Sequence, residues 1–442
     1  MSTHQHQSLA PVRVGILGLG TVGGGTLSVL QQTAQEIERR LGRSVQVTRV
    51  CVRRETEHDL TSIEISADAM EIARAKDVDI LVEAIGGTSV AREAVLLALQ
   101  HGKHVVTANK ALIAEHGSEL LAAAKEQQVA LVFEASVAGG IPILRALREG
   151  LAANKIDWLA GIINGTSNYI LTAMQNERQN FAPVLAEAQA LGYAEADPTF
   201  DVEGIDAAHK LCIMASCAFG VPLDFNAVAV EGIRQITLED IDYASELGYK
   251  VKHLGVARRT VRGIDLRVHP TLVPKTNLLA SVDGVMNSVL VHGDAVGSTF
   301  YTGAGAGALP TASSVVSDIV EVARGFGRQD HGYTPSLGFT AFSEEPRCPS
   351  TESTSSFYLR LTLADELGAL ASISTALAQS SISVEALLQK EPRVEDGVAK
   401  ATLIILTHEV SRGHIDQAVQ TLKDMPVVTS EVTVIPMEHF AG

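Results

Sequence analysis

The sequence VRVGILGLGTVG, residues 12–23, decides the fold of this chain. Its first half is mostly apolar and predicts a strand, and its second half has the spacing GxGxxG. In such a turn the first glycine permits a tight bend, the second lets the backbone approach a pyrophosphate, and the third lets the helix pack closely on the strand. The stretch favours a dinucleotide site, held at a helix N-terminus, over an unrelated glycine-rich turn. The residues expected at that site are Gly18, Gly20, Thr21, Val22 and Gly23.

Strand and helix patterns alternate from Pro11 to Glu134. Short, continuous apolar runs that alternate with longer helical periods indicate a parallel sheet covered on both faces. We expect strands at 12–17, 45–52, 80–83, 104–107 and 129–134, and helices at 21–41, 91–100 and 113–127.

Glycine and linker signals divide the remainder of the chain. Residues 139–142 (GGIP) break the alternation, and the run 303–307 (GAGAG) is expected where backbone approaches closely, before a helix at 311–326. Residues 343–356 are rich in Ser, Thr, Glu and Pro and are typical of a linker. The last region has a βαββαβ pattern: strands at 357–363, 382–389, 398–407 and 427–435, and helices at 369–379 and 415–422.

The fold class is therefore α/β. We expect a Rossmann-type nucleotide domain of residues 1–140 with a return of about 303–335, an α+β catalytic and dimerisation domain of 141–302, a linker of 336–356 and a ferredoxin-like domain of 357–437.

The composition argues against nucleic-acid and membrane partners. Lys and Arg number 35 against 51 Asp and Glu, a formal net charge of −16, whereas phosphate neutralisation needs basic patches. The longest apolar stretches, such as Ala94–Leu99, are far shorter than the roughly 20 residues of a membrane-spanning helix.

The cysteines and the N-terminal segment indicate a reducing compartment. Residues 1–9 are polar and show no secretory signal. The cysteines follow no zinc-binding spacing, and a cytoplasmic location is expected. They are Cys51, Cys212, Cys217 and Cys348.

Arginine follows the second predicted strand, where NAD-binding domains usually place an acidic residue for the ribose 2′-hydroxyl. The guanidinium of Arg53 suits a 2′-phosphate, so NADP is favoured over NAD. The alternative is that Arg53 and Arg54 are ordinary solvated residues.

Two lysines are candidates for the chemistry. Lys110 follows the strand at 104–107, and ligands of open α/β sheets bind beyond the carboxyl ends of strands. Asp206 and Lys210 are spaced i and i+4 at the start of a predicted buried helix, and so share one face. The alternatives are a solvated loop lysine and a surface ion pair.

The stretch GIINGTSNYIL at 161–171, followed by LGYAEADP at 191–198 and GIDAAHKL at 204–211, resembles the homoserine dehydrogenase family. The resemblance extends from Val12 to about Arg328. It implies NAD(P)H-dependent reduction of L-aspartate 4-semialdehyde to L-homoserine, in threonine, methionine and isoleucine biosynthesis.

The same resemblance implies a role for individual residues. Lys210 corresponds to the proton donor to the aldehyde oxygen, and Lys110 to a second active-site lysine that faces substrate and cofactor. Glu195 and Asp206 correspond to groups that hold the substrate, and Gly307 to a residue that returns to the nucleotide. The family also binds a monovalent cation, usually sodium, at positions that correspond to Glu134, Val137, Gly139 and Ile141.

The C-terminal stretch LADELGAL at 363–370 is similar to the ACT family of amino-acid-binding domains. Many ACT domains carry Pro where this chain has Leu367. The similarity implies an effector site with Asp365, Gly368 and Leu370, feedback inhibition by L-threonine, and a homodimer or homotetramer. The alternative is a purely structural dimerisation module.

Two other functions fit parts of the sequence. A ligand sensor without turnover would have no reason to keep Lys110, Glu195, Asp206 and Lys210 together. An aspartate semialdehyde dehydrogenase would need a nucleophilic cysteine, and no cysteine lies in a suitable motif. No kinase segment precedes residue 12, so a fusion with aspartokinase is not expected.

Overall fold

The computed structural model describes residues 9–53, 56–326, 333–395 and 398–440. The chain forms two compact units. The first comprises Met1–Lys155, Cys212–Phe225 and Tyr301–Glu344, and the second Ile156–Leu211, Asn226–Phe300 and Glu345–Gly442. Helix α10 (Ile205–Phe219) contributes residues to both units.

The first unit contains a six-stranded sheet with the strand order β3-β2-β1-β4-β5-β6. All neighbouring strands are parallel. The order reverses between β1 and β4, which makes the carboxyl end of β1 the place where such sheets bind ligands. The strands are β1 (Val12–Leu17), β2 (Val45–Cys51), β3 (Glu64–Ser66), β4 (Ile80–Glu83), β5 (His104–Thr107) and β6 (Leu131–Val132).

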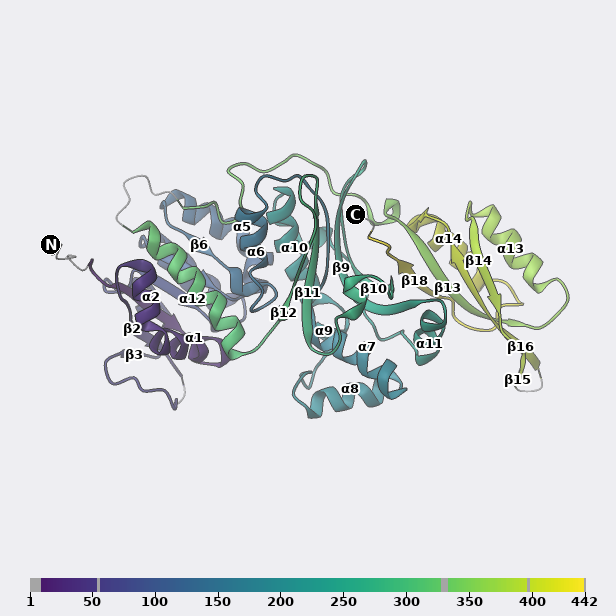
Figure 1. The fold of residues 1–442 in the computed structure, drawn as a ribbon, viewed down its shortest axis with the longest axis horizontal. Helices are drawn as coiled ribbons and strands as arrows, with labels where there is room; N and C mark the ends of the chain where they lie inside the picture. Colours follow the sequence, from purple (N-terminus) through teal and green to yellow (C-terminus); the bar gives the residue numbers. More distant parts are fainter. Residues whose placement is uncertain (1–8, 54–55, 327–332, 396–397, 441–442) are drawn as a thin grey trace, which may run out of the picture. The chain divides into compact units, whose positions relative to one another are not determined.

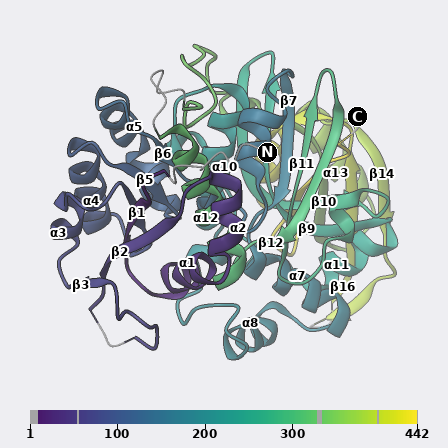
Figure 2. The same cartoon turned by 60° about the vertical axis from the view of Figure 1, so that its left-hand side comes forward.

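Helices cover both faces of this sheet (Figure 2), as the continuous apolar strands predict. The β1 residues Val12, Val14 and Ile16 are fully buried, and they belong to one core cluster with Leu27 of α1 and Ile319 of α12. One face carries α1 (Thr21–Gln32), α2 (Ala34–Leu41) and α12 (Ala308–Gly325), and the other α3 (Ala69–Arg74), α4 (Ser89–Gln100) and α5 (Lys110–Glu126).

The sequence-based elements differ most from the structure at four places. The strand predicted at 427–435 begins only at Thr433, as β18 (Thr433–Met437), because the chain first makes a turn in which the Val428 amide donates to the Met425 carbonyl. The helix predicted at 21–41 breaks at Thr33, whose hydroxyl donates to the Val29 carbonyl at 2.7 Å and competes with the helical backbone. The short elements β3 and α3 have no hydrophobic period long enough to detect. The strand predicted at 129–134 is only the two residues of β6, because the chain turns into a 3₁₀ helix, η1, at Glu134–Ser136.

The second unit is organised around a long mixed sheet with the order β12-β11-β7-β9-β10-β18-β13-β16-β14. Its centre is the hairpin of β9 (Tyr249–Thr260) and β10 (Gly263–Pro274), which pair along their whole length. The other strands of the first half are β7 (Ile156–Ile162), β8 (Ala229–Val230), β11 (Met286–Gly293) and β12 (Gly297–Ala304). The helices that accompany them are α7 (Gly165–Glu177), α8 (Phe181–Ala190), α9 (Thr199–Val202) and α11 (Leu238–Glu246).

The C-terminal region confirms the predicted ferredoxin-like order. Its strands pair antiparallel in the order β18-β13-β16-β14, which is 4-1-3-2 in the βαββαβ sequence. The elements are β13 (Thr354–Ala364), α13 (Ala369–Gln379), β14 (Val384–Gln389), β16 (Val398–Thr407), α14 (Arg412–Lys423) and β18 (Thr433–Met437).

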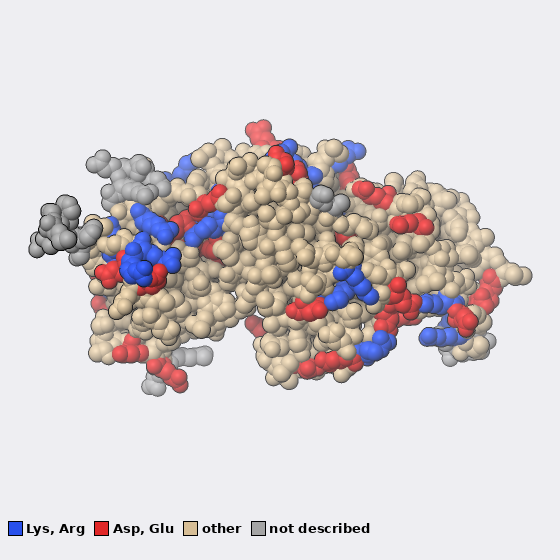
Figure 3. Space-filling model, in the orientation of Figure 1, with Lys and Arg blue, Asp and Glu red and all other residues tan. Residues whose placement is uncertain are grey.

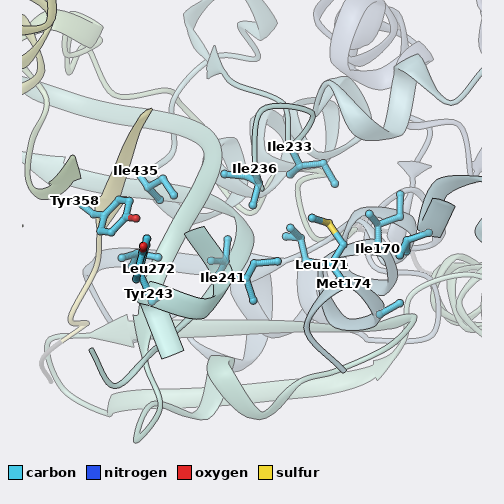
Figure 4. Packing of buried hydrophobic residues seen from close by; sticks show 14 of the residues in the cluster. Ile170, Leu171, Met174, Ile233, Ile236, Ile241, Tyr243, Leu272, Tyr358 and Ile435 are labelled. Carbon is cyan, nitrogen blue, oxygen red and sulfur yellow. The ribbon is translucent and has the colours of Figure 1, made fainter. Parts of the chain in front are cut away.

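The ferredoxin-like region continues the larger sheet, because β18 pairs with β10 through Leu272 and Met437 (Figure 1). One hydrophobic cluster contains residues from both parts, including Met174 of α7, Leu272 of β10 and Tyr358 of β13 (Figure 4). Within the segment that composition marks as a linker, the Pro346 carbonyl accepts from the amide of Ile264 at 2.8 Å. The ferredoxin-like region is therefore built into the second unit.

Charged groups of both signs are interspersed on the face drawn in Figure 3. None of the helices in the described residues is long and apolar enough to cross a membrane.

A buried ion cluster joins α11 to the ferredoxin-like region. Asp240 is fully buried and accepts from Arg360 of β13 at 2.5 and 3.0 Å and from the Tyr358 hydroxyl at 3.3 Å. It also caps its own helix in a capping box with Thr237. This carboxylate therefore stabilises both the local helix and the contact with β13.

Asp240→Asn is expected to lower the free energy of unfolding by about 3 kcal/mol, because it removes the fully buried counter-charge of Arg360 and leaves only the partly exposed Glu239, at 3.2 Å. The measurement is urea denaturation followed by circular dichroism. Asp242→Asn, on the same helix, is the control: its exposed pair with Arg178 contributes little. An equal loss of unfolding free energy in both variants would show that the buried pair contributes no more to stability than the exposed one.

Candidate active site

Three glycines shape the turn after β1, and each does what the GxGxxG spacing predicts. Gly18 has φ +86°, and a Cβ there would lie 2.9 Å from the Ala84 carbonyl oxygen. A Cβ on Gly23 would lie 1.8 Å from the Gly18 carbonyl oxygen, so only glycine lets α1 pack this closely. A Cβ on Gly20 would meet nothing within 4 Å, which leaves its backbone open to a ligand at the start of α1. Thr21 and Val22 begin the helix.

A hydrogen-bond network lies where β4 and β5 end. Glu83 is buried and accepts from the Thr107 hydroxyl at 2.5 Å and from the amides of Ile85 and Gly86. Burial raises the pKa of Glu83. The Thr107 hydroxyl also accepts from the Asn109 amide, and the Asn109 side chain caps α5 by accepting from the Leu112 amide at 3.1 Å.

This network positions Lys110 as the first residue of α5, beyond the carboxyl end of β5. The sequence identified Lys110 but missed Glu83, whose position at a strand end is its only sequence signal.

The run 303–307 approaches two other segments of the first unit, as its glycines predict. A Cβ on Gly139 would lie 2.4 Å from the Gly305 carbonyl oxygen, and the Gly140 amide donates to Ala304. Gly307 has φ +121° and precedes α12. The next residue, Ala308, lies against Gly25 of α1, since a Cβ on that glycine would lie 2.6 Å from the Ala308 carbonyl oxygen. Gly307 therefore lies beside the helix that begins at the nucleotide turn.

Glu134 is buried, and its carboxylate oxygens accept from the amides of Leu144 and Arg145 at 2.9 and 2.7 Å. Burial raises the pKa of Glu134, although the Arg148 guanidinium opposes this effect. Val137, Gly139 and Ile141 follow in the same turn, and the Gly139 carbonyl accepts from the Ser314 hydroxyl at 2.6 Å. No group of three or more His, Cys, Asp or Glu side chains in the described residues could hold a metal ion.

In the second unit, Lys210 and Asp206 form the pair that the i, i+4 spacing predicts. The Lys210 Nζ donates to Asp206 Oδ2 at 2.7 Å and to the Ile163 carbonyl at 2.8 Å. The two side chains are only 12% and 6% exposed, so the pair is not a surface ion pair. An ammonium has three donors, and the described contacts of Lys210 use two of them.

Asn164 completes this cluster and was missed from the sequence as a site residue. Its side-chain nitrogen donates to Asp206 Oδ2 and to Asp201 Oδ1, both at 2.8 Å, while its oxygen caps α7 by accepting from the Ser167 amide. The signal in the sequence is an asparagine at a strand end just before a helix, which is ordinary capping.

Glu195 is exposed, and no described contact joins its carboxylate to Lys210 or Asp206. Its loop is held to α7 by the Thr166 hydroxyl, which donates to the Tyr193 carbonyl at 2.6 Å. Arg53 is likewise exposed, two residues beyond β2, and Arg54 lies outside the described residues.

The loop between β13 and α13 lines a shallow pocket of about 520 Å³ that contains Asp365, Gly368 and Leu370. Gly368 has φ +89° and begins α13. Leu367 is fully exposed, so the loop accommodates leucine in place of proline.

These features define the class of the protein. The strand order and glycine turn are those of a dinucleotide-binding domain, the second unit holds a buried ammonium with a free donor, and the C-terminal order is that of an ACT domain. The class is an NAD(P)-dependent oxidoreductase with an ACT domain.

Comparison with known proteins identifies the family. Family models match residues 18–134 (homoserine dehydrogenase, NAD binding domain), 142–320 (homoserine dehydrogenase) and 357–427 (ACT domain). The homoserine dehydrogenase of Pseudomonas aeruginosa is 52% identical over 98% of this chain and 100% of its own length. The chain belongs to the homoserine dehydrogenase family.

Solved structures agree with this assignment. A homoserine dehydrogenase from Thiobacillus denitrificans has a TM-score of 0.92 at 48% identity, over 98% of this chain and 99% of its own. A hyperthermophilic archaeal homoserine dehydrogenase in complex with NADPH has a TM-score of 0.60 at 27% identity, over 71% of this chain and 97% of its own.

Gly20→Ala and Gly23→Ala are expected to separate nucleotide binding from stability. Gly20→Ala should keep the wild-type Tm, because its Cβ has open space and its φ of −72° suits any residue. Its affinity for NADPH should fall about ten-fold or more, because the methyl group blocks the approach of the pyrophosphate. Gly23→Ala should lower the Tm, because its Cβ overlaps the Gly18 carbonyl.

The measurements are thermal melting and NADPH fluorescence titration. Wild-type NADPH affinity in Gly20→Ala would contradict the assignment of this turn.

Proposed function

We propose that the chain reduces L-aspartate 4-semialdehyde to L-homoserine with NAD(P)H. The observation that carries this proposal is the Lys210 ammonium, which Asp206 and the Ile163 carbonyl hold while leaving one donor unused. That donor is what an aldehyde oxygen requires when negative charge develops on it.

The nicotinamide, when bound, supplies the hydride to the aldehyde carbon. Lys210 stabilises the developing oxyanion and then donates a proton to it. Asp206 keeps the ammonium oriented, and Asn164 fixes Asp206 through its hydrogen bond at 2.8 Å. Because all three side chains are largely buried, water competes little for the reacting oxygen.

The remaining substrate contacts follow from charge. The substrate carries an α-ammonium group, and carboxylates of Asp206 and Glu195 are suitable partners for it. Lys110, at the N-terminus of α5, is the second active-site lysine and faces substrate and cofactor. Protein carboxylates beside one end of the substrate and a lysine beside the other would orient it for hydride transfer.

The cofactor is NADP in preference to NAD. The exposed Arg53 can pair with a 2′-phosphate, and no acidic residue takes its place at the end of β2. The NADPH complex of the archaeal relative is consistent with this choice. Gly18, Gly20 and Gly307 are the positions where backbone comes closest to the phosphates.

A monovalent cation, sodium in the family, fits the turn after η1. Glu134 offers a buried carboxylate, and no described hydrogen bond ends on the Val137 carbonyl oxygen. The carbonyls of Gly139 and Ile141 accept one hydrogen bond each, and each retains a second lone pair. Such oxygen donors suit a hard cation, which would tie the turn to the start of α6 (Ile143–Arg145).

The ACT pocket at Asp365, Gly368 and Leu370 binds an amino-acid effector, and L-threonine, an end product of the pathway, is the inhibitor we propose. The protein acts in the cytoplasm as a homodimer or homotetramer.

Lys210→Ala is expected to lower kcat by about 10²–10⁴-fold, because the general acid is lost, while the affinity for NADPH stays unchanged. The assay follows NADPH oxidation with L-aspartate 4-semialdehyde. Lys275→Ala is the control, since the described contacts of that exposed side chain are both with Ser245. Turnover within a few-fold of wild type in Lys210→Ala would rule out the proposed role.

L-threonine is expected to lower the initial rate of the wild-type chain, and Asp365→Ala should weaken this inhibition by about ten-fold. Asp424→Ala is the control, because this exposed residue follows α14 outside the pocket. A flat response to millimolar L-threonine would remove the regulatory proposal and leave the catalytic one intact.

A further inference from the structure

A second cavity in the second unit lies where the ACT domain meets the catalytic sheet. Its volume is about 160 Å³, and β8, β10 and α14 contribute to its walls. The charged residues that line it are Glu231, Arg267, Arg412 and Asp416. None of its lining residues belongs to the pocket at Asp365.

His269 points to a ligand in this cavity. It lines the cavity and is 3% exposed, and its Nε2 has no hydrogen-bond partner among the described residues. Its Nδ1 lies 3.1 Å from the Pro270 carbonyl, which can only accept, and 2.9 Å from the Thr271 hydroxyl, which itself donates to the His269 carbonyl at 3.2 Å. A proton on Nδ1 satisfies all three contacts. Nε2 is then a buried acceptor without a donor, a costly state unless a donor binds.

The ion pairs that line the cavity leave a hydrogen-bond donor of an arginine and acceptors of two carboxylates unused. Arg412 Nε donates to Asp416 Oδ1 at 2.7 Å, and its Nη1 donates to Glu231 Oε1. Among the described contacts, none uses Arg412 Nη2, and none uses the second carboxylate oxygen of Glu231 or Asp416. Residues that line the cavity therefore carry a guanidinium nitrogen, carboxylate oxygens and an imidazole nitrogen that no described contact uses.

We propose that this cavity binds a small α-amino acid. The carboxylate of the ligand pairs with Arg412, and its ammonium donates to His269 Nε2 and Glu231. The positive charges of the two lining arginines equal the negative charges of the two lining carboxylates, which suits a zwitterion better than a dianion or a simple cation. The volume is well below the roughly 300 Å³ at which sites for drug-sized ligands begin, so a short side chain is expected.

His253 connects the cavity to the start of the helix that carries Lys210. The Glu231 carbonyl accepts from His253 Nε2 at 3.0 Å, and a Cβ on Gly204 would lie 3.1 Å from His253 Cε1. Gly204 immediately precedes α10, on which Asp206 and Lys210 lie. This proposal does not depend on the reaction proposed above, because it concerns binding alone.

The test is a thermal-shift screen of the full-length chain with each of the protein amino acids and L-homoserine, followed by calorimetric titration of those that stabilise it. Asp365→Ala is used as background, so that the ACT loop pocket does not contribute. Butyrate and n-butylamine are the probes that carry only one of the two charges. In that background, Arg412→Gln removes the carboxylate partner, and Ala229→Leu fills the cavity without changing its charge.

We expect at least one small amino acid to bind, with affinity about ten-fold weaker in Arg412→Gln and in Ala229→Leu, and neither single-charge probe to bind comparably. If Arg412→Gln fails to fold, Ala229→Leu still fills the cavity, and Glu231→Gln removes the carboxylate that pairs with the ligand ammonium, so the same loss of affinity is expected in both. Binding by no amino acid, binding unaffected by these variants, or equal binding of butyrate would each overturn the proposal. Turnover of the same samples, measured separately, reports on the catalytic proposal.

Discussion

The buried pair of Asp206 and Lys210 is the interaction on which the account of the active site depends. An ammonium that is 12% exposed needs a counter-charge and hydrogen-bond acceptors, and Asp206 and the Ile163 carbonyl provide them for two of its three donors. Asn164 ties Asp206 to the start of α7, because its side-chain nitrogen donates to Asp206 while its side-chain oxygen caps the helix. The strand end at Ile163, the cap at Asn164 and Asp206 in the first turn of α10 thus hold one ammonium group in place.

Local patterns predicted most of the fold. The glycine spacing after β1 located the nucleotide turn, and the i, i+4 spacing located Asp206 and Lys210 on one face of α10. The βαββαβ pattern predicted the strand order of the ACT domain. The helix break at Thr33 is a change of backbone conformation at one residue, and the strand predicted at 129–134 ends early where the chain turns into η1 at Glu134. Neither feature alters the hydrophobic pattern.

Glu83 and Asn164 were missed for a different reason. Each binds a residue distant in sequence, Thr107 in one case and Asp206 in the other, and the separations are 24 and 42 residues. Spacing arguments work within one element, whereas these contacts exist only once strands and helices are assembled. The continuation of the catalytic sheet into the ACT domain through β10 and β18 is of the same kind. It places the ACT domain in the same unit as the first part of α10, through Leu211.

The most direct measurement of the central claim is a crystal structure of the chain with NADP⁺ and L-homoserine. The account predicts that Lys210 Nζ lies within hydrogen-bond distance, about 2.7–3.2 Å, of the homoserine hydroxyl oxygen while still bound to Asp206. A hydroxyl held by another residue, with Lys210 directed away from the substrate, would contradict it.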